Sequence, residues 1–299
     1  KLILIGFSMF LIHKTVKNHI HSSMVWIFYL VFLIFPIDFY AYSIRNTIAV
    51  SIVIFAFRFL LEENKSGIFK YILFVLIAMQ FHVSSFIFII FVVIPILSNN
   101  NKMMLKLFLF LVFVFSTTLI ISSEALQLIM DIIVDKVLPL IGAAAHKSGY
   151  FKIAGRWGFL LSTIPHFLFF VLLNICKKNI INLYNCYCGQ IDFRDEKINS
   201  TYMFVSYVYY SNVFLTLIIP LIRVNFEFTR IFKSITPLYF IAVITTISLL
   251  KEKKKKHYHI VIMLLFTVII NYLVYVWPYR DITYLTLLTD NWIINTIFN

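Results

Sequence analysis

Charged residues are scarce in this chain, and acidic residues are the scarcest of them. Asp and Glu number 13 among 299 residues, against 26 Lys and Arg, while 61% of the residues are hydrophobic. The mean hydropathy is +0.91. One water-soluble core cannot bury so much apolar surface, which excludes an ordinary soluble domain. The composition predicts an all-α fold, namely a polytopic integral membrane protein.

Several common site signatures are also missing. The three cysteines offer only a C-x-C pair, without the second pair or the histidine spacing that a zinc site needs, so neither a metal nor a disulfide is expected. The chain has no P-loop, GxGxxG, HExxH or GxSxG motif. ATP-driven transport, dinucleotide chemistry and the familiar hydrolase mechanisms therefore lack support, and no cofactor is expected.

Apolar runs near the length of about 20 residues that a membrane span requires cover most of the chain. They occupy residues 23–36, 44–61, 68–97, 105–121, 157–176, 201–222, 234–250 and 260–277. We expect about eight to ten transmembrane or re-entrant helices in a single polytopic domain over residues 1–299. The chain begins with Lys1, and its first apolar run, 2–12, is too short to span, so a truncated N-terminus is expected.

Basic residues beside the spans predict the orientation, because short cytoplasmic loops are enriched in Lys and Arg. Five clusters occur, at 14–17, 65–70, 102–106, 177–178 and 251–256. Placing all of them in the cytoplasm puts residues 122–155 outside and makes residues 68–97 a hairpin with His82 at its turn. Because these clusters set topology and meet anionic lipid headgroups, the net charge of +13 does not imply a nucleic-acid partner.

The predicted outer loop, 122–155, has a pattern of its own. Apolar residues recur at three and four positions over 126–137, which predicts an amphipathic helix lying on the membrane. The segment 143–156 that follows is rich in glycine, aromatic and basic residues, and it includes Tyr150. It is suited to gripping a sugar chain or a pyrophosphate, and an ordinary connecting loop is the alternative.

Five cationic or titratable residues lie in or beside apolar runs: Arg45, His82, Arg156, Arg223 and Arg230. An arginine at mid-bilayer costs roughly 2.5 to 3.5 kcal/mol even on the more lenient insertion scale, so it normally faces a polar cavity or an anionic partner. The structural alternatives are snorkelling or interface anchoring for the arginines and a satisfied core position for the histidine. Glu227 lies four residues after Arg223 and three before Arg230, a spacing that allows an ion-pair ladder on a helix.

Two stretches resemble the EpsG family of membrane proteins, which are similar to the Wzy polymerases of bacterial polysaccharide assembly. The first stretch carries Arg45 and Ala49, then a short charged turn, and then Ala78 and His82. The second stretch, which fits more loosely, carries an arginine, two phenylalanines and a proline, at Arg223, Phe226, Phe228 and Pro237.

The resemblance implies a glycosyltransferase that polymerises oligosaccharide repeat units carried on undecaprenyl pyrophosphate. The product would be an exopolysaccharide, a capsule or an O-antigen. The protein would lie in the bacterial inner membrane with its site facing outward, beside a flippase and a chain-length regulator. The alternatives are a flippase or transporter of lipid-linked sugars, which would more often show internal repeats and Gly- or Pro-broken helices, and a membrane acyltransferase.

The expected roles follow from the chemistry of pyrophosphate release. Arginine binds phosphate oxygens bidentately and stays charged, so the arginines would neutralise the leaving group without a metal. A histidine is the usual general base for the acceptor hydroxyl. The expected site contains the catalytic residues His82 and Arg45 and the substrate-binding residues Arg223, Arg230, Arg156, Glu227 and Tyr150.

Overall fold

The structure is a computed structural model that describes residues 2–35, 43–95, 158–188, 196–219, 222, 228–250 and 253–271, with isolated positions at 106, 110, 114, 117 and 128. Every regular element in this part of the chain is a helix. The α-helices are α1 (Leu2–His19), α2 (Val25–Ile34), α4 (Ile44–Leu60), α5 (Lys65–Phe81), α9 (Gly158–Cys188), α10 (Glu196–Leu215), α12 (Thr229–Leu249) and α13 (Lys253–Asn271). The 3-10 helices are η1 (Ser22–Met24), η2 (Val83–Val93) and η6 (Thr216–Ile218). The predicted all-α fold is confirmed.

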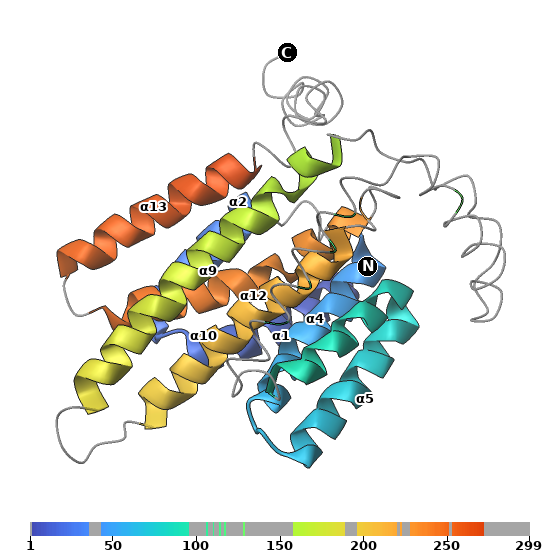
Figure 1. The fold of residues 1–299 in the computed structure, drawn as a ribbon, viewed down its shortest axis with the longest axis horizontal. Coiled ribbons are helices and arrows are strands. Elements are labelled where there is room, and N and C mark those ends of the chain that lie inside the picture. The colour runs from blue at the N-terminus through green and yellow to red at the C-terminus, as the bar shows by residue number, and fades with distance from the viewer. Residues whose placement is uncertain are drawn as a thin grey trace.

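Helix α12 lies at the centre of the described bundle, where α1, α2, α4, α9, α10 and α13 all contact it (Figure 1). Two segments are long and apolar enough to cross a membrane, Thr163–Asn182 within α9 and Thr229–Leu249, which is α12. The two segments differ in burial. The apolar part of α12 is 89% buried inside the bundle, and that of α9 is 28% buried.

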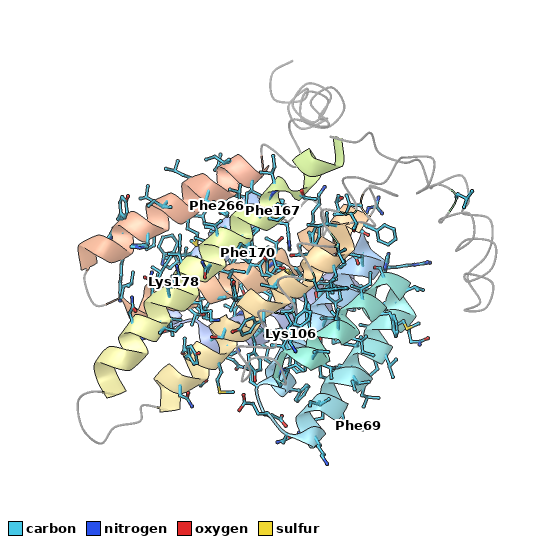
Figure 2. All side chains as sticks on the ribbon, viewed as in Figure 1. Phe69, Lys106, Phe167, Phe170, Lys178 and Phe266 are labelled. Atoms are coloured by element: carbon cyan, nitrogen blue, oxygen red, sulfur yellow. The ribbon has the colours of Figure 1, made fainter. Side chains whose placement is uncertain are left out.

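Large apolar side chains cover the outer faces of α5 and α13. Phe69 on α5 is 68% exposed and lies on the outer side of the bundle (Figure 2). On α13 the exposed apolar residues are Val261, Ile262, Leu265, Val268 and Ile269. Exposed apolar area on this scale is unfavourable in water and favourable against lipid tails, as expected for a membrane-embedded bundle.

A tight turn joins α4 to α5 as an antiparallel pair. Glu63 in the turn has a φ of 49°, and the Asn64 side chain caps α5 by accepting a 2.6 Å hydrogen bond from the Gly67 N–H. A Cβ on Gly67 would lie 2.3 Å from the Phe59 carbonyl oxygen, so only glycine fits where the two helices meet. The start of α4 and the end of α5 therefore lie at the same end of the bundle.

After α5 the chain turns back on itself. His82 is extended, and η2 returns beside α5, where the Tyr71 hydroxyl donates a 2.9 Å hydrogen bond to the Phe88 carbonyl. The hairpin predicted for residues 68–97, with His82 at its turn, is therefore present over residues 65–93. Its two arms differ from the expected pair of equal α-helices. The 17 residues of α5 reach about 25 Å, and η2 reaches about 22 Å with only 11 residues because a 3-10 helix rises further per residue.

Cations from three helices gather at one end of the bundle and lie against aromatic rings. The Arg58 guanidinium is 4.0 Å from the centre of the Phe55 ring and 4.7 Å from the centre of the Phe59 ring. Lys14 lies over the first ring at 5.6 Å, and Lys70 over the second at 5.5 Å. We call the end formed by the last turns of α1 and α4 and the first turn of α5 the basic end.

The opposite end, which we call the far end, contains the start of α4, the end of α5 and the start of α12. The direction of α12 follows from a 3.3 Å hydrogen bond between the Thr245 hydroxyl and the His19 carbonyl, which places the last turns of α12 beside the end of α1. Because α12 is 21 residues long, its first turn lies at the far end.

Candidate functional site

Three of the predicted site residues lie at the same end of the bundle, the far end. Arg45 lies in the first turn of α4, His82 follows the last residue of α5, and Arg230 lies in the first turn of α12. Both arginines are exposed, and His82 is half-buried. The far end therefore presents two guanidinium groups and one imidazole from elements that lie as much as 185 positions apart in the sequence, from Arg45 to Arg230.

The other predicted site residues lie outside the described residues. They are Arg156, Arg223, Glu227 and Tyr150. The expected amphipathic helix in 122–155 also lies outside them, apart from the single position Leu128. Their participation in the site stays a prediction.

The ring of His82 is held by a neighbouring serine. Its Nδ1 is 2.6 Å from the Ser84 hydroxyl oxygen, and its backbone N–H donates to the Ala78 carbonyl at 3.1 Å. When Nδ1–H donates to Ser84, the lone pair of the neutral ring lies on Nε2. This tautomer is the one that a general base requires, and the serine also fixes the plane of the ring.

The small residues of the first EpsG-like stretch have a packing role. Ala49 of α4 and Ala78 of α5 are both fully buried, and these two helices contact each other more extensively than any other pair in the described bundle. Small side chains let helix backbones approach closely inside a membrane. Asn46, beside Arg45, is 4% exposed, and its Nδ2 has no hydrogen-bond partner among the described residues.

A second histidine centre lies between α9, α10 and the 3-10 turn that follows α10. His166 is 2% exposed, and its Nδ1 is 3.2 Å from the Asn212 amide nitrogen. Its Nε2 is 3.1 Å from the Thr216 hydroxyl oxygen, and its ring stacks on Phe232 of α12 at 4.2 Å between ring centres. Since the amide N–H₂ can only donate, Nδ1 accepts and Nε2–H donates to Thr216.

The sequence-based prediction missed His166. A histidine in a membrane span is a candidate functional residue by default, and His166 lies within the apolar run 157–176. That rule could have identified His166 as a candidate. Its partners could not be predicted, because Asn212 and Thr216 lie 46 and 50 positions away and no sequence pattern near His166 indicates them.

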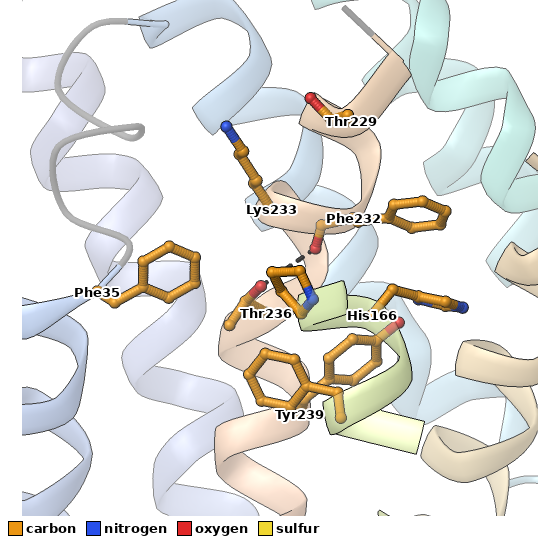
Figure 3. Close-up of a pocket in the computed structure, with 9 residues that line it drawn as sticks. Phe35, His166, Thr229, Phe232, Lys233, Thr236 and Tyr239 are labelled. Carbon is orange, nitrogen blue, oxygen red and sulfur yellow. Dashed lines mark hydrogen bonds between the residues drawn. The ribbon is translucent and has the colours of Figure 1, made fainter. Parts of the chain in front are cut away.

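A small cavity lies beside this centre, toward the far end (Figure 3). Its volume of about 20 Å³ gives room for one water-sized group. Residues from α9 and α12, with Phe35 after α2, line it, among them Pro165, His166, Lys233, Thr236 and Tyr239. Figure 3 shows Lys233 and Thr229 nearer the start of α12 and Tyr239 deeper in the bundle.

Two polar atoms beside the cavity lack hydrogen-bond partners among the described residues. They are the Tyr239 hydroxyl and the Asn212 Oδ1, on side chains that are 1% and 0% exposed. The Tyr239 hydroxyl nevertheless lies close enough to the Asn212 side chain to interact with it. In the described part of the chain, no group of three or more His, Cys, Asp and Glu side chains could hold a metal ion.

Comparison with known proteins gives the family. No curated protein and no solved structure matches the chain. The EpsG family, a Wzy-like polymerase family, matches residues 1–287. The match covers nearly the whole chain, including α4, α5 and every other helix described above. The protein therefore belongs to the EpsG family and is a membrane protein with a role of the polysaccharide-polymerase type.

Proposed function

We propose that this protein is a multi-pass glycosyltransferase of the bacterial plasma membrane that polymerises lipid-linked oligosaccharide repeat units at the outer face. In this reaction the bond between the anomeric carbon of the growing chain and undecaprenyl pyrophosphate breaks. A new glycosidic bond forms to a hydroxyl oxygen of the next lipid-linked unit. The hydroxyl proton passes to a base, and the pyrophosphate departs on its lipid.

The observation that carries the proposal is that Arg45, His82 and Arg230 lie at one end of the bundle, opposite the basic end. Lys and Arg favour the cytoplasmic side of a membrane, so the basic end is assigned to the cytoplasm and the far end to the outside. The far end is then where units delivered to the outer leaflet would meet the three side chains.

Each group has a role that suits its chemistry. The exposed guanidinium of Arg45 would neutralise charge on the departing pyrophosphate, and the Asn46 amide beside it offers an unused N–H donor. His82, held by Ser84, would take the proton of the acceptor hydroxyl. Arg230 would hold a second phosphate oxygen.

Further residues from outside the described part complete the proposed site. Arg223 would join Arg45 on the pyrophosphate, Arg156 would assist, Glu227 would orient the neighbouring arginines, and Tyr150 would contact the glycan. We assign charge neutralisation to the arginines and no metal. The proposed partners are the lipid bilayer, the undecaprenyl-pyrophosphate-linked glycan and the flippase and chain-length regulator of the same pathway, whose product is an exopolysaccharide, a capsule or an O-antigen.

The test compares polymer length on a gel from cells that lack their own polymerase and carry the wild type, Arg45→Ala or His82→Ala. Two control variants remove the same residue classes at the basic end: Lys178→Ala, which removes an exposed cation, and His257→Ala. Membrane levels are matched by immunoblotting. We expect long polymer from the wild type and both controls, and loss of polymer from the two site variants.

The location of unpolymerised material decides between the polymerase and a flippase. If single lipid-linked repeats accumulate on the outer leaflet in Arg45→Ala cells, the protein acts after translocation, as proposed. Repeats trapped on the cytoplasmic leaflet would assign the protein to translocation instead. Polymer of normal length from both site variants would remove Arg45 and His82 from the mechanism.

A further inference from the structure

Two neighbouring lysines of α9 have different surroundings. Lys178 is exposed, whereas Lys177 is half-buried between α9 and α10. The Lys177 ammonium donates a 2.7 Å hydrogen bond to the Tyr210 hydroxyl. It also lies 4.2 Å from the centre of the Tyr210 ring and 4.9 Å from the centre of the Tyr209 ring. We call Lys177, Tyr209 and Tyr210 the lysine-tyrosine cluster.

The lysine-tyrosine cluster lies toward the basic end of the bundle. Helix α9 runs in the same direction as α12, because Phe169 packs on Tyr239 and, seven residues later, Cys176 contacts Thr246. The last turns of α12 are at the basic end, so Lys177 is there too. It lies in the last two turns of the membrane-crossing segment 163–182. A lysine at this depth can extend its ammonium to the headgroup level of the nearer leaflet.

The cluster has hydrogen-bond donors that no protein group accepts. The Lys177 ammonium has three N–H groups and donates one of them to Tyr210. The Tyr210 hydroxyl accepts that bond, and its own O–H donates to no described residue. No carboxylate in the described part of the chain pairs with Lys177. A positive charge and several donors are therefore left for an acceptor from outside the protein.

The two rings decide the sign of the ligand's charge. Each ring face attracts a cation, and Lys177 already lies over both rings. A second cation would be repelled by the ammonium. A phosphate oxygen would instead accept hydrogen bonds from the ammonium and from the Tyr210 hydroxyl. Hydrogen bonds between charged groups of this kind are the strong ones.

Apolar side chains beside the cluster suit the tails of a lipid. Phe170 lies seven residues before Lys177, and therefore on the same face of α9, and its ring packs on Tyr209 at 5.5 Å between ring centres. Figure 2 shows Phe170 near the middle of α9. On the adjoining stripe of the helix, Val171 and Ile175 are exposed. An acyl chain can follow α9 toward the middle of the membrane while its phosphate lies at Lys177.

We propose that the lysine-tyrosine cluster binds the phosphate of an anionic phospholipid in the leaflet at the basic end. The Lys177 ammonium and the Tyr210 hydroxyl bind phosphate oxygens, and the Tyr209 ring holds the ammonium in place. The exposed cation of Lys178 adds only general attraction. This site is separate from Arg45 and the rest of the far end, and it does not depend on the proposed reaction.

The test compares two lipids added to the purified full chain in detergent. Phosphatidylglycerol and phosphatidylcholine share a phosphodiester and differ in net charge. The apparent unfolding temperature is measured with each lipid, and retention of radiolabelled phosphatidylglycerol gives a direct measure of binding. The variants are Lys177→Met, Tyr210→Phe and the matched control Lys178→Met, which removes one cation at the next position.

We expect phosphatidylglycerol to raise the unfolding temperature of the wild type and of Lys178→Met more than phosphatidylcholine does. Lys177→Met should bind labelled phosphatidylglycerol at least about tenfold more weakly, because hydrogen bonds to a charged group are lost. The two lipids should then give this variant the same unfolding temperature. Tyr210→Phe should bind about two- to tenfold more weakly, since it loses one donor and keeps the charge.

Several outcomes would overturn the inference. If Lys177→Met is destabilised equally in both lipids and binds phosphatidylglycerol as the wild type does, the lysine has only a structural role. Equal weakening by Lys177→Met and Lys178→Met would show general attraction without a defined site. If Lys177→Met does not fold, Tyr210→Phe decides, and unchanged or tighter binding by it refutes the site. Inorganic phosphate that raises the wild-type unfolding temperature as far as phosphatidylglycerol does would refute the assignment to a lipid.

Discussion

Replacing Gly67 with alanine should damage both the stability of the protein and its proposed activity. Gly67 lies where the turn after α4 enters α5, and the Asn64 cap bonds to its N–H at 2.6 Å. The added Cβ would lie 2.3 Å from the Phe59 carbonyl oxygen and 2.9 Å from the Glu62 Cβ. The first of these contacts is with backbone, which cannot turn aside as a flexible side chain can.

The size of the effect follows from that overlap. Ordinary contact begins near 3.4 Å, so the start of α5 must move away from the end of α4 by 3.4 − 2.3, or about 1 Å. Overpacking of this kind costs about 1 to 3 kcal/mol, and the better helix propensity of alanine returns up to about 1 kcal/mol. Because the clash is with backbone, we take the upper end of the cost and expect a net loss of about 2 kcal/mol. Because α5 carries His82, a displacement of about 1 Å could also lower polymerisation by up to about 10²-fold.

The assay is thermal unfolding of the purified protein in detergent, together with the polymer gel from complemented cells. Gly6→Ala is the matched control, because a Cβ at that position in α1 meets no atom within 4 Å. Alanine there should stabilise the helix by up to about 1 kcal/mol. If Gly67→Ala unfolds at the wild-type temperature or above it, the close approach of the two helices is not the reason for the glycine.

Two further changes test the far end and the basic end. Ser84→Ala removes the 2.6 Å contact with His82, so polymerisation should fall about two- to tenfold, whereas Ser248→Ala at the basic end should leave polymer length unchanged. Burial lowers the pKa of His19 at the basic end from 6.5 to about 4, so folding favours the neutral ring. The free energy of unfolding should then be highest above pH 6.5 and should decline as the pH falls toward 4. The pKa shift sets an upper limit of about 3 kcal/mol on this decline, and partial exposure of the side chain makes it smaller. His19→Phe keeps a ring stacked on Phe204, so its unfolding temperature should fall less steeply over this pH range, and an unchanged slope would contradict the reasoning.

The path of the chain around His82 could be predicted from charge alone. Basic residues on both sides of the apolar run 68–97 required that run to return to its starting side, and the structure contains the turn at His82. The 3-10 conformation of η2 could not be predicted. The periodicity of apolar residues does not distinguish a 3-10 helix, with hydrogen bonds between residues three apart, from an α-helix, with hydrogen bonds between residues four apart.

The candidate site was predicted only in part, for a physical reason. Arg45, His82 and Arg230 were identifiable because each is a polar residue in or beside an apolar run. Their position at one end of the bundle depends on helix directions, which follow from contacts such as that between Thr245 and His19. The centre around His166 depends on partners from α10, and no pattern within a single helix encodes such a pairing.

The cations at the basic end have a consequence for how the protein sits in an energised membrane. Arg58 and Lys14 lie against phenylalanine rings, which stabilise a cation without cancelling its charge as a carboxylate would. These two side chains therefore keep their positive charge, whereas Lys70 at the same end is paired with Glu62 at 3.0 Å. In the proposed orientation, with the basic end in the cytoplasm, the inside-negative membrane potential opposes outward movement of these charges by about 2.3 kcal/mol per charge for each 100 mV. Because the phenylalanine rings leave Arg58 and Lys14 charged, the membrane potential favours the orientation with these residues on the cytoplasmic side.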